Sequence, residues 1–512
     1  MGPSPLFTDH PAIPSTCIDL PSTWQKVKHM TEGTSQTEPV TTAEAACQVL
    51  RKLDVDVQTD PEPHRSFKLL TNYDRGSMVD FLAKVESTVS AQLLQNIKST
   101  AFDGWSAHWE DSINTTTLQH TLSHSRRDPS MLCSDLSWNK NGITIAVAFG
   151  KWGHESWCSH KGMLCTWSLA TKSGADEPAF ELEVESCLMC ISFHPMDPSL
   201  IVGGTFNGQV FVCRTNDTED DPIIAASKMS DLTHQEPVAK IAWIPGPKVD
   251  QYQIVSIGND GKVLIWDLAN KLAAPISGSQ LQIGSIPRHL RTGGPTKPDA
   301  ILGGTTISFP PENPTIYLTG TEAGYIAKCS RSVSTTIPPN AVSLPRLANP
   351  IQFAYTPHTG PVTAMACSPF HRNLFLSCGS DGLVRIYNVL ETKQLCTLEP
   401  SQSSIYCADW SPVRATVFAC TSSDGLVYIY DLAHNPTLPH TTLEGSGKAS
   451  VSCTSLAFNA KRPEYLATGD GSGEVRIWRL STQLASSNDL WQMRIVETLG
   501  GLDEREGVFG GT

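Results

Sequence analysis

Asp381–Tyr387 reads DGLVRIY, and this short stretch decides the fold. A glycine follows an acidic turn residue, and after it polar and apolar residues alternate as they do in a half-buried β-strand. The chain contains seven copies of this unit, each with an aromatic residue or a cysteine five positions after the glycine. The glycines are Gly162, Gly208, Gly261, Gly324, Gly382, Gly425 and Gly473, and the residues five positions later are Trp167, Cys213, Trp266, Cys329, Tyr387, Tyr430 and Trp478. Internal repetition of this kind predicts an array of similar small sheets.

Each copy also has a residue upstream of its glycine that marks an earlier strand. These residues are Trp138, Phe193, Trp243, Phe309, Cys367, Trp410 and Phe458. Their separation from the glycine is 15 residues in five copies, 18 in the third and 24 in the first, where GKWGHESWCSHKG is an insertion. Each copy therefore predicts short antiparallel strands joined by tight turns, in which glycine supplies the positive φ. One such sheet cannot bury both of its faces, whereas a closed ring of sheets can.

The unit resembles the WD40 repeat, and IWDL at Ile265–Leu268 and IYDL at Ile429–Leu432 come close to its dipeptide signature. We therefore expect an all-β fold: a seven-bladed WD40 β-propeller over residues 131–482, preceded by a disordered N-terminal arm and one amphipathic helix. His234 and His358 stand where WD repeats use a histidine to bridge a turn aspartate and a strand. Both are expected to be structural.

The seventh copy lacks an obvious outer strand after Leu480. Two segments could supply this strand: FDGWSAHW at Phe102–Trp109, or LWQMRIVET at Leu490–Thr498. The first would pair the start of the chain with its end, but the shorter connection favours the second. Residues 100–130 are accordingly expected to be a linker, and residues 483–512 a C-terminal tail that holds the closing strand.

The composition excludes several classes of protein. A net charge of −13 with no basic block argues against a nucleic-acid partner, and the apolar runs are too short for membrane insertion. The 15 cysteines are scattered through apolar strands, which predicts reduced thiols in the cytosol. Neither a G-x-S-x-G elbow, a Walker A sequence nor an H-E-x-x-H motif occurs. We therefore predict no enzymatic activity, no cofactor and no metal.

The richest group of metal-ligating residue types stands in the insertion of the first copy. It comprises His154, Cys158, His160 and Cys165. Its spacing fits no familiar zinc template, and Cys165 belongs to a predicted strand. A surface insertion without a metal is the expectation.

Residues 1–74 are rich in Pro, Ser, Thr and acidic residues, which predicts a disordered arm. Residues 75–99 differ, because apolar side chains recur there at spacings of three and four and predict an amphipathic helix. These side chains are Met78, Phe81, Leu82, Val85, Val89, Leu93 and Ile97. Ser77 and Asp80 have the spacing of a capping box and would begin this helix, which would end at Lys98. The pattern leaves open whether the helix docks on the propeller or binds a partner.

Within the arm, Val55–Pro61 reads VDVQTDP, which alternates like a strand but has no neighbouring strand to pair with. Such a stretch suits addition to the edge of a partner's sheet. By composition alone it is also compatible with a plain solvated linker.

Three segments and the order of elements carry a resemblance to a known family. They are Ser368–Tyr387 (SPFHRNLFLSCGSDGLVRIY), Asp409–Cys420 (DWSPVRATVFAC) and Ala101–Trp109 (AFDGWSAHW). They resemble the intermediate chains of cytoplasmic dynein, above all those of cytoplasmic dynein 2, the motor of retrograde intraflagellar transport. The resemblance implies a non-catalytic subunit that links light chains to the motor heavy chain for this transport and for cilium assembly. It places the chain in the cytoplasm, the cytoskeleton and the cilium, including axoneme and basal body. A generic WD40 adaptor, such as a ubiquitin-ligase substrate receptor or a signalling scaffold, is the alternative.

The resemblance also implies binding sites and partners. DYNLL-type light chains would take up the arm at VDVQTDP, and TSQTEP at Thr34–Pro39 would be a second copy. The residues involved would be Val55, Asp56, Val57, Gln58, Thr59 and Asp60, and in the second copy Ser35, Gln36 and Thr37. The helix would carry a roadblock-type light chain, and Tctex-type light chains are further expected partners. A light-chain dimer on two arms would recruit a second intermediate chain.

The propeller would bind the dynein 2 heavy chain, and the assembly would join intraflagellar transport trains. Arg372 and Arg414 occupy equivalent places after an S-P pair in the fifth and sixth copies. They would contact the heavy chain or brace their own loops, and the repeated position favours the brace.

Overall fold

The computed structural model describes residues 74–98, 115–154, 157–169, 177–216, 221–248, 251–291, 297–338, 345–446, 451–486 and 490–500. The chain divides into two compact units, residues 1–106 and residues 107–512. The described part of the first unit is one helix, α1 (Arg75–Lys98). The second unit carries the sheets.

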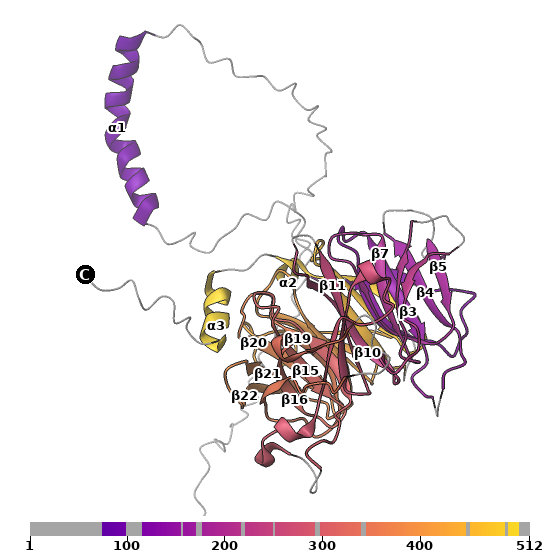
Figure 1. The fold of residues 1–512 in the computed structure, drawn as a ribbon. Coiled ribbons are helices and arrows are strands. Elements are labelled where there is room, and N and C mark those ends of the chain that lie inside the picture. Colours follow the sequence, from indigo (N-terminus) through magenta and orange to yellow (C-terminus); the bar gives the residue numbers. More distant parts are fainter. Residues whose placement is uncertain are drawn as a thin grey trace, which may run out of the picture. The chain divides into compact units, whose positions relative to one another are not determined.

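The described residues of the second unit form seven antiparallel sheets, which are the blades of a β-propeller (Figure 1). Blades one and two are β2 (Leu132–Trp138), β3 (Thr144–Gly150), β4 (Gly162–Ser168) and β5 (Phe180–Val184), then β6 (Leu188–Phe193), β7 (Leu200–Thr205), β8 (Val210–Arg214) and β9 (Ile223–Ala226). Blades three and four are β10 (Val238–Pro245), β11 (Tyr252–Gly258), β12 (Lys262–Trp266), β13 (Ser277–Gln280) and β17 (Thr335–Thr336), then β14 (Gly304–Ser308), β15 (Ile316–Thr321), β16 (Ile326–Ser330) and β18 (Ile351–Ala354). Blades five and six are β19 (Val362–Cys367), β20 (Leu374–Gly379), β21 (Val384–Asn388) and β22 (Gln394–Leu398), then β23 (Ile405–Trp410), β24 (Val417–Ser422), β25 (Leu426–Asp431) and β26 (Thr441–Glu444). Blade seven is β1 (Thr117–Leu122), β27 (Cys453–Phe458), β28 (Tyr465–Asp470) and β29 (Val475–Arg479).

The ring closes through the first strand of the second unit. The innermost strands β2, β6, β10, β14, β19, β23 and β27 contact one another in turn, and β27 returns to β2. The outer strand of blade seven is β1, which pairs antiparallel with β29 from Thr117↔Arg479 to Leu122↔Val475. The expectation of a closing strand at Leu490–Thr498 was therefore wrong. That segment lies in the helix α3 (Leu490–Gly500), the propeller begins at Thr117 rather than at 131, and Phe102–Trp109 lies outside the described residues.

The recurring glycine has the backbone conformation that the repeat predicts in six of its seven copies. Gly382 has φ +76°, and an added Cβ there would also meet the carbonyl oxygen of Ser401 at 2.8 Å. The first copy, Gly162, begins β4 instead and is confined by the backbone of the next blade, where a Cβ would meet the carbonyl oxygen of Ser186 at 2.3 Å. The residue five positions later is buried in all seven copies, as for Tyr387, whose ring stacks on Phe375 of the same blade with centroids 5.0 Å apart.

The two histidines bridge turn and strand as expected. His358 Nδ1 lies 2.9 Å from Asp381 Oδ1, and its Nε2 lies 2.8 Å from the Ser377 hydroxyl. His234 makes the same pair of contacts with Asp260 and Ser256. Burial raises the pKa of Asp381, but the contacts with His358 and the hydrogen bonds from the backbone N–H groups of Thr359 and Leu383 together outweigh burial and lower the pKa to about 2. These networks fix the turns of blades three and five, which confirms their structural role.

Short helices decorate the propeller. They are η1 (Leu268–Asn270), η2 (Ile283–Ser285), η3 (Arg288–Leu290), η4 (Arg331–Val333) and α2 (Thr482–Ala485). Along the described ranges, no helix is long and apolar enough to cross a membrane.

The helix of the first unit begins differently from the expected capping box. Asp74 caps α1, because its carboxylate accepts hydrogen bonds from the backbone N–H groups of Gly76 at 3.2 Å and Ser77 at 3.4 Å. Asp74 outcompetes Ser77 for this position since its carboxylate stands one turn earlier and favours the positive end of the helix dipole. The expected helix therefore exists, and it starts two residues before Ser77.

Candidate functional site

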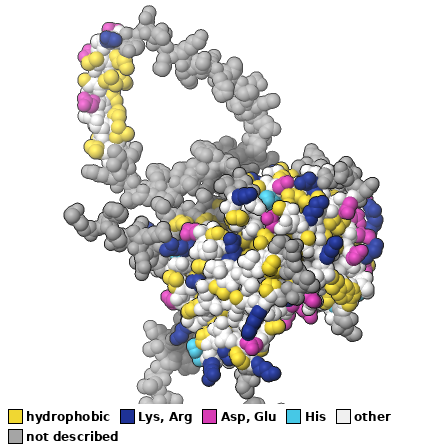
Figure 2. All heavy atoms as spheres, viewed as in Figure 1, with side chains coloured by type: hydrophobic (Ala, Val, Ile, Leu, Met, Phe, Trp, Pro, Cys, Tyr) yellow, Lys and Arg dark blue, Asp and Glu magenta, His cyan; other side chains and the backbone are white. Residues whose placement is uncertain are grey.

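The apolar stripe of α1 is exposed on the helix itself. Phe81 and Leu82 expose 62% and 54% of their surface, and Val85 is half-buried. Met78, Val89 and Leu93 are also exposed, while the side chain of Ile97 lies outside the described residues. Figure 2 shows the hydrophobic side chains gathered along one side of α1, with acidic side chains elsewhere on its surface. A helix that presents large apolar side chains in one row suits a groove of complementary shape.

The other predicted light-chain segments cannot be placed. Thr34–Pro39 and Val55–Pro61 lie outside the described residues, and their roles stay predictions.

Arg414 holds the chain that leaves the propeller. It follows β23 in blade six, and its guanidinium donates hydrogen bonds to the carbonyl oxygen of Gln483 and, at 2.9 Å, to the hydroxyl of Ser486. Asp431 lies 3.8 Å from the same guanidinium. In blade five the equivalent place, three residues before the second strand, is taken by His371, and Arg372 follows it and is half-buried. The contacts of Arg414 are those of a brace, and a heavy-chain contact by either arginine stays a prediction.

The helix α3 covers the neighbouring part of the propeller, beside the strands of blade five (Figure 1). Val496 is buried in the cluster formed by blades five and six, and Met493 and Leu499 pack against it. The side-chain amides of Asn373 and Asn388 donate hydrogen bonds to the last helix carbonyl, at Gly500. Sequence reasoning missed this docked helix. Its signal is the spacing of four between the buried residues Gln492, Val496 and Gly500, which fits a helix and not a strand.

Titratable side chains line the central channel of the propeller. A cavity of about 500 Å³ is lined by residues of the inner strands, among them Asp135, Lys240 and Asp409. Asp135 is fully engaged: Oδ1 accepts from Leu136 N–H, Oδ2 accepts from Ile191 N–H, and Lys240 Nζ lies 3.0 Å from both oxygens. The carboxylate thus joins blades one, two and three. This arrangement holds neighbouring blades of the ring together. It also leaves the Asp135 carboxylate no lone pair for general-base catalysis.

Asp409 has a different environment in the same channel. Burial raises the pKa of Asp409 to about 6, although its side chain accepts a hydrogen bond from Trp410 N–H at 2.9 Å. The carboxyl group in the folded protein therefore holds its proton more tightly than in the unfolded chain. This group contributes no penalty below pH ~4, and the folded state loses stability as the pH rises from ~4 to ~6.

Replacing Asp409 with asparagine is therefore expected to stabilise the protein at pH 7.5 by about 1 kcal/mol. Raising the pKa of this carboxyl group from about 4 to about 6 corresponds to about 3 kcal/mol of folding free energy at pH 7.5. Solvent in the open channel screens the carboxylate and reduces this effect. The gain should shrink on acidification and vanish near pH ~4. Chemical denaturation of both proteins across this range measures it. A gain that does not change with pH, or a loss at pH 7.5, would contradict this assignment.

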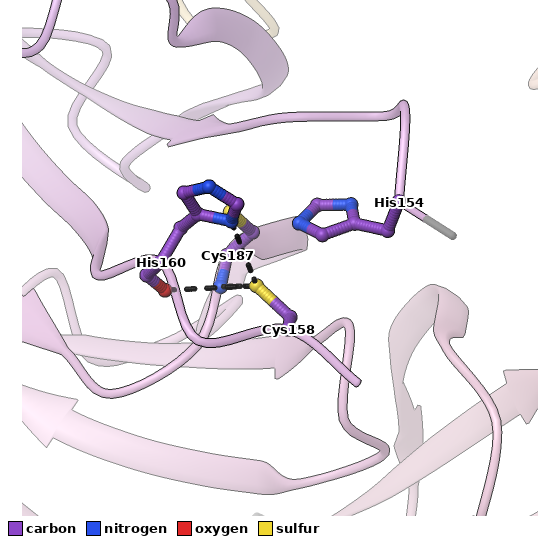
Figure 3. A group of neighbouring side chains, drawn as sticks. All are labelled: His154, Cys158, His160 and Cys187. Carbon is purple, nitrogen blue, oxygen red and sulfur yellow. Dashed lines mark hydrogen bonds between the residues drawn. The ribbon is translucent and has the colours of Figure 1, made fainter. Parts of the chain in front are cut away.

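One group of described residues could hold a metal ion. Its members are His154, Cys158, His160 and Cys187, whose ligand atoms all lie within 4.8 Å of one another (Figure 3). Cys165, which the sequence grouped with the first three, is instead wholly buried inside β4 and packs in the core of blades one and seven.

Comparisons with known proteins agree with this architecture. The family model for the WD domain, G-beta repeat, matches residues 349–388 and 392–431, which include the inner strands of blades five and six. Cytoplasmic dynein 2 intermediate chain 2 of Mus musculus is 34% identical over 488 residues, covering 94% of this chain and 90% of the relative. The chain belongs to the dynein intermediate chain family.

Other relatives of the family agree. The Homo sapiens cytoplasmic dynein 2 intermediate chain 2 is 33% identical over the same shares of both chains. The 78 kDa intermediate chain of the flagellar outer arm of Chlamydomonas reinhardtii is 30% identical over 368 residues, covering 70% of this chain and 49% of the relative. The resemblance to dynein intermediate chains is thus confirmed, and the repeat model matches blades five and six, which hold two of the three segments that carry the resemblance.

Proposed function

We propose that this dynein intermediate chain is a non-catalytic subunit of the cytoplasmic dynein 2 motor. In this proposal the arm and α1 bind light chains, and the propeller binds the heavy chain. The single observation that carries the proposal is the match to cytoplasmic dynein 2 intermediate chain 2 over 94% of the chain, which is more than the propeller strands alone span. The assembly would serve retrograde intraflagellar transport and cilium assembly, with the chain in the cytoplasm, the cytoskeleton and the cilium.

The assignment of the strands supports this division of labour. The ring is closed by β1, so the described strands of the propeller all belong to the second unit. The exposed row of Phe81 and Leu82 has the character of a binding face for a roadblock-type light chain. Heavy-chain contact falls to the propeller, where Arg372 and Arg414 are the proposed contact residues.

Titration of the arm peptide Leu53–Glu62 with a DYNLL-type light-chain dimer tests the light-chain half of the proposal. Alternate side chains of an added strand enter pockets, and its backbone completes the partner's sheet edge. We expect saturable binding by calorimetry, and a weakening of at least about tenfold when Gln58 and Thr59 are both changed to alanine. The matched control uses a peptide that is one residue longer, Lys52–Glu62. In this peptide Lys52 and Glu62, which lie outside the VDVQTDP stretch, are both changed to alanine. Absence of binding up to millimolar peptide, or equal affinities for all three peptides, would refute this half.

A further inference from the structure

The four residues of the candidate metal group come from two places in the chain that the fold brings together. His154, Cys158 and His160 belong to the connection between β3 and β4 in blade one. Cys187 lies in the junction between β5 and β6, where blade one passes to blade two. Because adjacent strands run antiparallel, these two connections lie at the same end of their sheets. Figure 3 shows the four side chains converging on one region.

We propose that His154, Cys158, His160 and Cys187 bind one Zn²⁺ ion at the junction of blades one and two. Two cysteine sulfurs and two imidazole nitrogens form the donor set that Zn²⁺ prefers in closed tetrahedral sites. Two thiolates balance the charge of the ion, so the site needs no further acidic group. Bond lengths to zinc place donor atoms about 3.3–3.8 Å apart in a tetrahedron. The present separations, up to 4.8 Å, are close enough for the ion to draw the four side chains inward.

The burial of these side chains suits a metal site. Cys187 and Cys158 are almost completely buried, while His160 is exposed and can swing toward the ion. His160 Nδ1 already lies 4.0 Å from Cys158 Sγ. Both ring nitrogens of His154 are buried, and neither makes a hydrogen bond of ordinary geometry within the described part of the chain. A buried polar atom without a partner calls for an explanation, and a metal ion bound by this imidazole provides one.

The surroundings hold the donor atoms in place. The backbone N–H of Cys187 points at Cys158 Sγ from 3.4 Å, a contact that stabilises a thiolate. The side chain of Asn207 clamps the backbone of Cys158 from blade two: its oxygen accepts from Cys158 N–H at 3.0 Å, and its amide donates to the Cys158 carbonyl at 2.9 Å. The ring of Phe206 lies 4.1 Å from the ring of His154. Supporting contacts of this kind orient the ligands of a metal.

The consequence is structural. With four protein ligands the ion has no open position for a substrate, so the site would fasten the insertion of blade one to the start of blade two. Zinc binding releases the protons of any thiols that are still protonated and stabilises the folded state. The sequence hides this site because its fourth ligand stands 27 residues after His160, in another blade junction, while a nearer cysteine lies in a strand core.

Elemental analysis of the full-length chain tests the proposal. The protein is purified under reducing conditions without chelator, and zinc is measured by mass spectrometry. We expect about one zinc per chain. Cys158→Ser and His160→Gln should each lose most of it, whereas Cys396→Ser, a half-buried cysteine of blade five, should retain it. Asn207→Ala should keep the ligands but weaken zinc affinity by about 10–100-fold in competition with a chelator. Replacement by Co²⁺ should give the absorption of a tetrahedral cobalt–thiolate centre in the wild type.

Because His160 is exposed, His160→Gln keeps the test valid if Cys158→Ser does not fold. Folded wild-type protein that contains less than about 0.1 zinc per chain after exposure to Zn²⁺ would overturn the proposal. So would equal zinc content in the wild type and His160→Gln, or a Cys158–Cys187 disulfide in protein kept reduced throughout.

Discussion

Replacing Phe81 and Leu82 together with aspartate is expected to abolish binding of a roadblock-type light chain. Both side chains belong to the exposed row on α1, and each exposes more than half of its surface. Aspartate at these positions removes two apolar anchors and would bury two charges in an apolar groove. An affinity loss of at least about 100-fold corresponds to about 2.7 kcal/mol, which is within the range of two anchor residues. Titration of the full-length variant with the purified light chain measures it.

The matched control places the same two charges elsewhere on the helix. Ser87→Asp with Ala91→Asp changes exposed positions on the side opposite the apolar row. It should bind with nearly unchanged affinity and show the same helix content by circular dichroism. An equal loss of affinity in both variants would mean that the added charge or a less stable helix, and not the loss of the apolar row, causes the effect. Unchanged affinity in both variants would show that α1 does not contact the light chain.

Deleting residues 117–122 is expected to open the propeller. This deletion removes β1, so β29 loses its outer partner and the backbone pairing from Thr117↔Arg479 to Leu122↔Val475. Five of the six side chains of β1 are exposed, so most of the loss is backbone hydrogen bonding, together with the buried side chain of Leu122. About three hydrogen bonds at about 1 kcal/mol each, together with about 2 kcal/mol for burial of the leucine, give a loss of folding free energy of about 5 kcal/mol. That is comparable with the whole stability of many domains.

The variant that lacks residues 117–122 should therefore aggregate through the exposed strand edge, or its melting temperature should fall by at least about 5 °C. Replacing His120 with alanine, which removes an exposed side chain of β1 and keeps its backbone pairing, is the control and should leave the melting temperature within about 1 °C. Thermal unfolding followed by circular dichroism compares the two. An unchanged melting temperature after loss of residues 117–122 would show that β1 does not hold the ring closed.

The blades could be predicted from the sequence because each one contains the same local sequence pattern. A turn glycine, a strand and an aromatic residue or cysteine five positions later recur with a fixed offset, and the structure places them in seven equivalent sheets. The closing strand could not be found in this way. TLQHTL at Thr117–Leu122 is mostly exposed and shows little apolar alternation, because its role depends on backbone pairing with β29. Leu490–Thr498 was favoured because its connection is shorter, yet its buried positions are spaced by four, and tertiary packing against blades five and six selects the helix.

The candidate sites divide in the same manner. The apolar row of α1 follows from local periodicity and could be read directly, whereas its cap at Asp74 was missed in favour of Ser77. The metal group could be read only in part, because Cys187 joins it through the packing of two blades. Asp135 and Lys240, which form an ion pair between blades, are 105 residues apart in the sequence, so no local pattern predicts their contact.

Affinity purification of the full-length chain from ciliated cells, with quantitative mass spectrometry, tests the central claim most directly. The wild type should recover the dynein 2 heavy chain together with light chains and components of transport trains. The variant Phe81→Asp with Leu82→Asp should retain the heavy chain and lose the roadblock-type light chain. Recovery of ubiquitin-ligase or signalling subunits without any dynein heavy chain would contradict the account.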